Sequence, residues 1–470
     1  MTASLRESLA AIVGEKYVSE QEYVRKSYTR GPSWGRGEAP AIVVKPCKTE
    51  EVSEIVKLAN QHSVPIIPRG GGASTALGGF PKSERVSDSI LVDLTRMNRF
   101  LYLDEENMVA AAEAGIVLSD LSTIIAERGY HMHTVDIPQY IDTLGGVLSG
   151  FNGGGEPSDL AVVGELGNFI LGLEVVLPNG DIITTGAGPG TNQHTEHMVD
   201  RTPGSPNITG MFLGDAGVFG IKTRVYFRVF PKQGEFTYGA FQFESFEEMW
   251  AVFSKLMRVN PYLYTRMVGI LPVWEKKWTI FYVIRGAKEE IAFRKAWLET
   301  LCREGGGEEI SNTLARDIIM TFSGRQLGKY YASRGKFKYF EHILRKSDAP
   351  DFLRKQEGFI KEKMSAAGLD IYVTDSVKYI VPKERHSVVM GHLYFMDEGK
   401  MNEKEKEAFE QIGYEEVDHL LEYGGFVEGA QGNLTRKSAS VWQPEYHRFV
   451  KAIKSALDPN NILNPGLWRL

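Results

Sequence analysis

Three clusters rich in glycine are the part of this sequence best suited to chemistry. They span residues 69–74, 144–155 and 214–221. Glycine is required where the backbone adopts a positive φ or comes close to a ligand, and the free amides of such a loop can form a nest that binds an anion. Because each cluster lies at the end of a predicted strand or helix, the three together indicate one large anionic ligand. Arg69 would add a charged donor at its rim.

The usual phosphate motifs do not account for these loops. The chain has no G-x-x-x-x-G-K-[ST] sequence, which excludes a Walker-type ATPase. Residues 70–72 lack the G-x-G-x-x-G spacing, and no acidic residue follows at the distance expected of a ribose partner, which argues against a Rossmann NAD site. One glycine loop alone can be an ordinary tight turn, so the inference depends on all three.

The elements that position the first cluster read as strand, helix, strand and loop. Residues 41–44 are a β-branched run that is typical of a buried strand. A helix is predicted to begin near Thr49, a favourable N-cap residue that is followed by acidic residues. Residues 64–68 form the next strand and run straight into the glycines. This order predicts a right-handed βαβ unit.

Hydrophobic periodicity and turn residues predict the other elements. Strands are expected at residues 89–94, 108–114, 170–177 and 182–185, and helices at 118–128 and 446–457. One amphipathic helix followed by a polar lead-in is expected within 5–30, a hairpin turn at 178–181, and mainly helical structure at 312–366. After Gln233 glycine becomes rarer, while aromatic and basic residues increase. This change predicts a second compact domain over residues 236–440.

The composition narrows the class of protein. Of 470 residues, 43% are hydrophobic and 24% are charged, which is ordinary for a globular protein and excludes disordered and fibrous classes. The 54 basic and 60 acidic residues give a net charge of −6, so the chain has no basic footprint for nucleic acid. Glycine, at 49 residues, exceeds its usual share of about 7% because of the three clusters.

Cysteine usage and hydropathy point to a reduced, cytoplasmic protein. Two cysteines, Cys47 and Cys302, are too few for a disulfide framework or a cysteine-based zinc or iron–sulfur site. The first residues lack the apolar core of a signal peptide. No apolar run approaches the roughly 20 residues of a membrane span, so we expect no transmembrane segment.

The glycine clusters carry a resemblance to a known family. Residues 67–74 resemble the FAD-pyrophosphate loop of the vanillyl-alcohol-oxidase/p-cresol-methylhydroxylase flavoproteins, and residues 142–149 resemble their second flavin loop. Residues 212–223 are similar to the third loop, where D-lactate dehydrogenase and the flavin subunit of glycolate oxidase, the branch that this chain most resembles, usually carry Ser-Glu-Gly. The family's following strand and its terminal signature resemble residues 168–178 and 457–466.

The resemblance implies an α+β fold. Residues 1–235 would form an FAD-binding domain of two α+β subdomains, residues 236–440 a cap of antiparallel sheet plus helices, and residues 441–470 a return to the first domain. FAD would be bound by Pro68, Arg69, Gly70, Gly71, Gly72, Ala73, Ser74, Thr143, Leu144, Gly145, Gly146, Ser149, Gly153, Gly217, Gly220, Ile221 and Asn464. Part of the family attaches its flavin through a histidine where this chain has Ala73, so we expect non-covalent FAD.

The cap departs from the 2-hydroxy-acid branch of the family. That branch often carries H-x-G-D-G-N-x-H and S-G-E-H-G, which supply metal ligands and a catalytic histidine. Here His392 alone remains of the two histidines in the first motif, while Ala430 and Gln431 stand for the metal-binding Glu and the catalytic His of the second. An amide is not a base, so we expect no catalytic metal.

Five residues remain as candidates for the reaction itself. Arg334, in a segment that resembles the family's W-x-x-R, would hold a substrate acid or be an ordinary surface arginine. His392 with Tyr394 would be a proton acceptor and its orienting partner, or a core histidine. Gln431 and Asn433 would hydrogen-bond a substrate or the flavin edge.

The resemblance predicts an FAD-dependent dehydrogenase. It would transfer hydride from a hydroxyl-bearing carbon, most simply of a 2-hydroxy acid, to flavin N5. Electrons would pass to a partner, an iron–sulfur subunit or an electron-transfer flavoprotein, within a homo- or hetero-oligomer. Three alternatives stay open: oxidation of a phenolic or benzylic alcohol, the chemistry of alkylglycerone-phosphate synthase, and a non-catalytic FAD subunit that only relays electrons.

Overall fold

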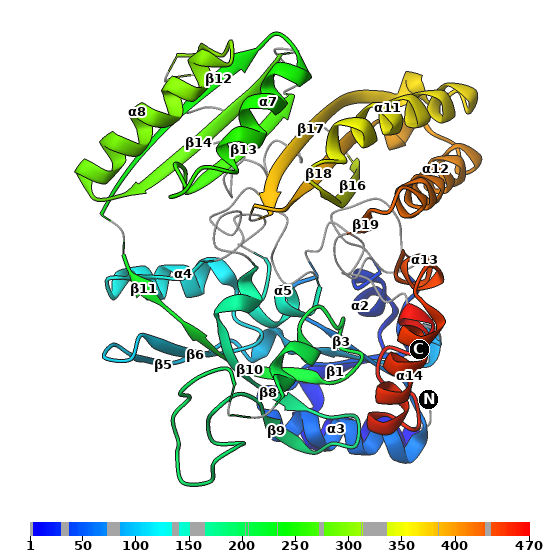
Figure 1. The fold of residues 1–470 in the computed structure, drawn as a ribbon. Coiled ribbons are helices and arrows are strands. Elements are labelled where there is room, and N and C mark those ends of the chain that lie inside the picture. Colours follow the sequence, from blue (N-terminus) through cyan, green and yellow to red (C-terminus); the bar gives the residue numbers. More distant parts are fainter. Residues whose placement is uncertain are drawn as a thin grey trace.

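The chain folds into two parts, one above the other in Figure 1. The computed structural model describes residues 3–29, 37–72, 85–133, 141–150, 165–202, 204, 206–232, 234–271, 277–311, 313, 336–383, 385–427 and 434–470. The lower part, called the glycine-loop region here, comprises the described residues up to 232 and residues 434–470. The upper part, called the cap region, comprises the described residues between 234 and 427. The expected domain boundaries at residues 235 and 440 stay a prediction.

A four-stranded sheet carries the first glycine loop. Strands β2 (Ile42–Val44), β4 (Ile90–Asp93) and β3 (Ile66–Arg69) lie parallel in that order, and β1 (Val18–Ser19) is antiparallel to β2. Helix α3 (Thr49–His62) connects β2 to β3 and buries one apolar face. The predicted strand–helix–strand unit is therefore present, with β4 inserted between its two strands.

A five-stranded antiparallel sheet stands beside the second and third loops. Its strands, in spatial order, are β5 (Phe100–Asp104), β6 (Val109–Glu113), β10 (Ile221–Arg228), β8 (Ile170–Val176) and β9 (Ile182–Thr184). Helices α4 (Leu118–Glu127) and α5 (Leu144–Gly150) share a core with β6, β8 and β10. The expected hairpin turn is confirmed, because Gly180 has a φ of +88° and its N–H donates to Leu177 O at 2.8 Å.

An eight-stranded sheet forms the cap region. Its spatial order is β15 (Glu308–Glu309), β12 (Glu235–Phe243), β14 (Trp278–Gly286), β13 (Arg266–Leu271), β17 (Val373–Lys383), β18 (Ser387–Met396), β16 (Lys336–Arg345) and β19 (Phe426–Val427). All of the pairings are antiparallel. An antiparallel cap sheet with helices is the architecture that the resemblance implied.

Four helices cover a single face of the cap sheet, which we call the helix face. They are α7 (Phe246–Leu256), α8 (Lys288–Glu304), α11 (Ala349–Ala366) and α12 (Glu403–Glu422). Their residues share one apolar core with Met267, Ile280, Ile380 and Met390 of the strands. Because strand side chains alternate between faces, the residues between these positions point to the opposite face. We call it the inner face.

The C-terminal segment returns to the glycine-loop region, where α13 (Leu434–Ser440) and α14 (Pro444–Leu457) lie along its edge in Figure 1. Beyond α14, Leu463 forms a parallel bridge with Ile66 of β3, and Ile66 N–H donates to Ile462 O at 2.6 Å. The end of the chain thereby adds to the edge of the first sheet.

One expectation about secondary structure is wrong. The single helix with a polar lead-in that was expected within residues 5–30 is replaced by two helices, because α1 (Ala3–Val13) ends before Gly14, whose φ of +91° leaves the helical region, and α2 (Glu22–Ser27) follows separately. Residues 312 and 314–335 lie outside the described residues, so the expectation of mainly helical structure at 312–366 stays a prediction. In the described part, α11 is a helix of 18 residues, and β16 is a ten-residue strand that pairs with β18 along its full length. Pairing with β18 makes residues 336–345 a strand, and local periodicity does not report such pairing.

Candidate functional site

The first and second glycine loops are in direct contact. A Cβ added to Gly70 would overlap Thr143 Oγ1 and would lie 3.4 Å from Gly146 Cα, and a Cβ added to Gly71 would overlap Ile141 O. A Cβ on Gly146 would lie 2.8 Å from the same Thr143 oxygen. Only glycine therefore allows these two backbones to approach each other.

The third loop and the C-terminal segment join the same cluster. A Cβ on Gly217 would lie 2.7 Å from Pro68 Cγ, so the third loop touches the start of the first. Asn464 Nδ2 donates to Ala216 O at 2.6 Å, and Asn464 N–H donates to Ile66 O at 3.0 Å. Asn464 therefore ties the end of the chain to two of the loops.

Hydrogen bonds also connect the second loop to the third. Gly214 N–H donates to Leu148 O at 2.7 Å, and Ala216 N–H donates to Ser149 O at 2.8 Å. Gly220 packs on β8, because a Cβ there would overlap Val175 Cγ1. The three clusters, separated by up to about 150 residues in sequence, form one continuous cradle of backbone, as the sequence predicts for one large ligand.

Two side-chain oxygen atoms in the second loop have no hydrogen-bond partner among the described residues. Thr143 Oγ1 is buried against Gly70 and Gly146, and the Asp142 side chain next to it is 7% exposed with Oδ2 unpaired. Burial raises the pKa of Asp142 to about 8. Buried polar groups are normally satisfied, so these two atoms indicate that a ligand completes the cradle.

Arg69 is held beside the first loop and is not a free surface charge. Its guanidinium donates to Tyr28 O at 3.0 Å and lies 4.9 Å from the centre of the Tyr28 ring. Tyr28 Oη donates to Asp93 Oδ2 at 2.6 Å, and Lys45 pairs with the same carboxylate. Burial raises the pKa of Asp93, but hydrogen bonds from Thr95 and Tyr28 together with Lys45 outweigh it, so the net pKa is lowered. Asp93 is therefore a fixed anion that orients the side chains of Tyr28 and Lys45.

Two buried ion pairs support the third loop and the C-terminal signature. Lys222 of β10 pairs with Asp215, which also accepts from Gly217 N–H at 3.1 Å. Lys454 of α14 pairs with Asp458 and donates to Val218 O at 3.1 Å and Leu463 O at 2.8 Å. Both pairs fix backbone that forms the cradle.

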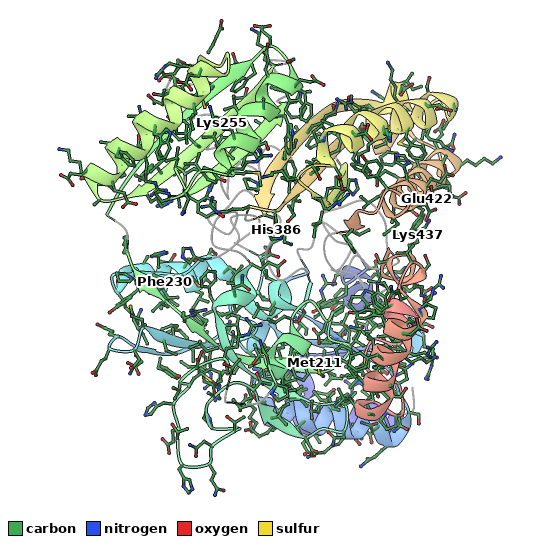
Figure 2. All side chains as sticks on the ribbon, viewed as in Figure 1. Met211, Phe230, Lys255, His386, Glu422 and Lys437 are labelled. Atoms are coloured by element: carbon green, nitrogen blue, oxygen red, sulfur yellow. The ribbon has the colours of Figure 1, made fainter. Side chains whose placement is uncertain are left out.

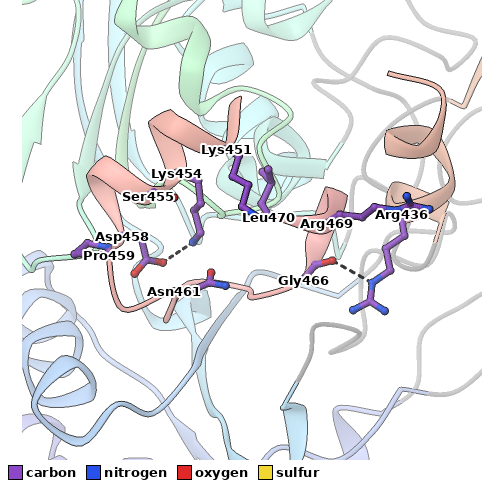
Figure 3. Close-up of a pocket in the computed structure, with 10 residues that line it drawn as sticks. All are labelled: Arg436, Lys451, Lys454, Ser455, Asp458, Pro459, Asn461, Gly466, Arg469 and Leu470. Atoms are coloured by element: carbon purple, nitrogen blue, oxygen red, sulfur yellow. Dashed lines mark hydrogen bonds and ion pairs between the residues drawn. The ribbon is translucent and has the colours of Figure 1, made fainter. Parts of the chain in front are cut away.

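A pocket of about 580 Å³ is lined by residues of this C-terminal segment (Figure 3). Figure 3 shows the Lys454–Asp458 pair at one end of it and Arg436, which donates to Gly466 O, at the other. Its lining contains no residue of the predicted FAD set. The pocket is therefore distinct from the cradle.

The structure places His392 and Tyr394 on the helix face of the cap sheet. Met390 of β18 points to the helix face and is paired with His342 of β16. His392, two residues later on the same strand, therefore points to that face too, and Tyr394 packs against the core between α11 and α12. His392 is 4% exposed, and neither ring nitrogen has a hydrogen-bond partner in the described parts of the chain. Burial lowers its pKa well below the usual value. The cap's own core encloses this pair, and its catalytic role stays a prediction.

The inner face of the cap sheet looks toward the glycine-loop region. Lys383, at the end of β17 on this face, pairs with Glu165 of the lower part at 2.6 Å. Figure 2 shows His386, in the turn after β17, between the two parts. Arg266 and Tyr379 lie on the same face and are 7% and 6% exposed. The alternation of strand residues shows which side chains share a face of the sheet. It does not show which face the helices cover, so the sequence alone could not identify the inner face.

The other predicted site residues divide into two groups. The structure brings together Pro68, Arg69, Gly70, Gly71, Gly72, Thr143, Leu144, Gly145, Gly146, Ser149, Gly217, Gly220, Ile221 and Asn464 in or beside the cradle. Ala73, Ser74, Gly153, Arg334, Gln431 and Asn433 lie outside the described residues. Sequence reasoning missed Asp142, whose signal is burial without a partner.

Two further features are absent from the described residues. No group of three or more His, Cys, Asp or Glu side chains there could hold a metal ion. None of the helices described is both long and apolar enough to cross a membrane.

Two family models match the chain in the parts that build the cradle. Residues 40–186 match a model described as an FAD binding domain. Residues 390–467 match a model described as the C-terminal domain of FAD linked oxidases. The first match contains two of the glycine loops and the second contains Asn464.

Individual proteins resemble the chain over nearly its whole length. The glycolate oxidase subunit GlcD of Bacillus subtilis is 23% identical, with 99% of this chain and 97% of that protein covered. A D-lactate dehydrogenase of Anaerostipes hadrus is also 23% identical, with 97% and 95% covered. The crystal structure of p-cresol methylhydroxylase with substrate bound superposes with a TM-score of 0.81 at 20% identity and covers 99% of this chain and 96% of that one.

Proposed function

Because this chain belongs to the FAD-linked oxidases of the vanillyl-alcohol-oxidase/p-cresol-methylhydroxylase family, we propose that it is a dehydrogenase that oxidises a hydroxyl-bearing carbon. FAD is its cofactor. When bound, FAD supplies the hydride acceptor at N5 of its ring system. The preferred substrate is a 2-hydroxy acid, and electrons leave to a partner protein.

The cradle is the observation that carries this proposal. Glycine lets its three loops come closer together than a residue with a Cβ would, as at Gly70 and Gly217. The cradle also contains the Thr143 hydroxyl, which has no partner among the described residues. Backbone amides brought close to a ligand in this way suit the pyrophosphate of a dinucleotide. The residues present therefore fit FAD.

Non-covalent binding is part of the proposal. Cys302 is fully buried in the cap core, where burial raises the pKa of its thiol to about 12. Cys47 lies before α3, where its Sγ donates to Glu51. Neither thiol is a residue of the three loops, and Ala73 stands where part of the family has its linking histidine.

The inner face of the cap supplies groups for an anionic substrate. Arg266 contributes a guanidinium there, and Tyr379 adds a phenol whose ring lies over Gly391, where a Cβ would overlap it. A guanidinium binds a carboxylate through two parallel hydrogen bonds. We place the substrate carboxylate at Arg266, with Arg334, Gln431 and Asn433 as the further predicted contacts.

Two relatives support the substrate class and the partner. Their names specify glycolate and D-lactate, both 2-hydroxy acids, and one of them is named as a subunit. We propose an iron–sulfur subunit or an electron-transfer flavoprotein as the electron acceptor of this chain, and a cytoplasmic location.

An anaerobic substrate screen tests the proposal. The full-length protein with FAD is mixed with glycolate, the two enantiomers of lactate and longer 2-hydroxy acids, and the flavin absorbance is followed. Loss of the oxidised flavin bands with a 2-hydroxy acid, at a rate that saturates with concentration, is the expected result. Absence of bleaching with every compound would favour the non-catalytic relay subunit.

A phenolic or benzylic alcohol is the second candidate. It is favoured by the inner face of the cap, whose described centre is apolar and aromatic around Phe281, Tyr379 and Leu393, and by Ala430 and Gln431 in place of the hydroxy-acid motif. Bleaching by 4-alkylphenols or vanillyl alcohol, with none by the acids, would replace the first proposal with this one.

A further inference from the structure

Asp142 is a buried acid where the second loop meets the first, and none of the described residues supplies a countercharge for it. Its backbone is fixed, because its carbonyl accepts from Leu118 N–H at 2.9 Å and Thr143 forms an antiparallel bridge with Val117. On the other side, the preceding Ile141 carbonyl fills the space beside Gly71. Asp142 is therefore clamped between α4 and the first glycine loop.

None of the described charged groups on the surrounding elements pairs with Asp142. Arg69 of the first loop faces Tyr28 and Asp93. Glu113, at the end of β6, is paired with Arg99, and Asp120, in the first turn of α4, is exposed. Burial is the sole cause of the raised pKa of Asp142, so no described cation stabilises its carboxylate.

A buried carboxyl group without a partner favours its neutral form. Burial of an ionised group without a partner is strongly unfavourable, and a protein avoids the cost by keeping the group protonated. A protonated carboxyl has one O–H donor. Asp142 Oδ2 has no acceptor within the described chain, so the donor is left for a ligand.

We propose that Asp142 binds FAD in its neutral form and donates a hydrogen bond from its carboxyl group to an oxygen or nitrogen acceptor of the cofactor. Thr143 Oγ1, which is unpaired in the same loop of the described chain, adds a second hydroxyl contact. The proposal depends on FAD as the cofactor and not on the substrate suggested above. An FAD site with no donor at Asp142 would bind the cofactor equally well at all pH values near neutrality.

The sign of the pH effect follows from this protonation state. The complex needs the proton, so FAD affinity is constant below the pKa of Asp142 in the apoprotein and falls above it, roughly tenfold per pH unit above about pH 8. The ionised carboxylate would also repel the negative charges of the pyrophosphate. Raising the pH therefore releases FAD.

The test is a titration of the full-length apoprotein with FAD, in which quenching of the flavin fluorescence reports binding. The titration is repeated at several pH values between about 6.5 and 9.5, on either side of the pKa of Asp142. Asp142→Asn keeps a donor without a titrating proton, and we expect its affinity to stay within a few-fold of the wild type at pH 7 and to lose the pH dependence. Asp142→Ala should bind FAD roughly tenfold more weakly at pH 7, the factor expected for one lost hydrogen bond. Asp120→Asn is the matched control and should behave as the wild type.

Two additional readings locate the acceptor and guard against misfolding. The affinity for ADP is measured by competition with FAD. If Asp142→Ala weakens ADP binding, the acceptor lies on the pyrophosphate half of FAD. A shifted flavin spectrum with ADP binding unchanged would place it on the ring. Thermal unfolding of each apoprotein shows whether it is folded. Folded variants that bind FAD as the wild type does, together with a wild-type affinity that is flat with pH, would overturn the proposal whatever the substrate screen gives.

Discussion

Gly70 and Thr143 lie so close that the threonine hydroxyl occupies the space of a Gly70 side chain. The two residues come from different loops on different sheets, 73 positions apart in the sequence. Their contact closes one side of the cradle, and the contact of Gly217 with Pro68 closes the other. The proposed binding of FAD depends on these close approaches.

Replacement of Gly70 by alanine should disrupt the cradle. The added Cβ overlaps Thr143 Oγ1, so one of the loops must move, which we expect to cost about 1–3 kcal/mol in stability and to abolish tight FAD binding. Flavin content after purification and the melting temperature check this. Gly358→Ala in α11, where a Cβ meets nothing within 4 Å, is the matched control and should keep full flavin content. A yellow, wild-type-like Gly70→Ala protein would contradict the prediction.

The buried Lys454–Asp458 pair should be essential for stability. The side chains are 4% and 1% exposed, and the lysine also holds the Val218 and Leu463 carbonyls. Lys454→Met leaves the buried Asp458 carboxylate without its countercharge, with only the N–H groups of Ile462 and Leu463 donating to it among the described residues, and we expect a loss of about 3–5 kcal/mol in urea unfolding. Lys451→Met, on the same helix but exposed, should change stability by less than about 0.5 kcal/mol. Equal effects of the two substitutions would show that the pair is not what holds the C-terminal segment.

His392 should behave as a core residue and affect stability through pH. Burial lowers its pKa in the folded state, so the unfolded chain takes up a proton first as the pH falls below about 6.5, and the folded state loses stability there. His392→Leu should therefore gain stability relative to the wild type as the pH falls from about 8 to about 5, by up to about 1.4 kcal/mol per pH unit below 6.5.

Urea unfolding at the two pH values measures this effect, with the exposed His194→Leu as control. The same variant tests the catalytic prediction for His392. We expect substrate-driven bleaching of the flavin to be retained. A folded His392→Leu protein that binds FAD but no longer bleaches would establish His392 as part of the reaction.

Arg266 should control the binding of an acidic substrate. Arg266→Met removes the cation from the inner face, and we expect KM for the acid to rise roughly 10- to 100-fold, as for the loss of a charge-assisted hydrogen bond of about 1.5–3 kcal/mol. The flavin spectrum should not change. Arg354→Met, on the outer surface of α11, should leave KM as it is. An unchanged KM in Arg266→Met would place the carboxylate elsewhere, with Arg334 as the next candidate.

The sequence predicted those parts of the fold that follow local rules. The strand that ends in Arg69, the hairpin at Gly180 and the glycine loops are marked by residue types with one main structural use. The α+β class and the cap sheet followed from the resemblance. The helix break at Gly14 was missed, because glycine inside a periodic pattern is a weak signal of a helix end.

The rest depended on contacts that the sequence does not show. The strand pattern places His392 and Tyr394 on one face, but which face the helices cover is decided by the packing of α11 and α12. Asp142 looks like an ordinary loop aspartate until its burial and missing partner are known. Arg266 and Tyr379 became candidates because Lys383, on their face, contacts Glu165 of the lower part.

The absorbance spectrum of the purified full-length protein, before and after acid precipitation, tests the central claim most directly. The account predicts the bands of oxidised flavin in the native protein and their complete release into the supernatant as FAD, close to one per chain. Flavin that stays with the precipitate would contradict non-covalent binding. A colourless protein that cannot be reconstituted with FAD would contradict the assignment of the cradle itself.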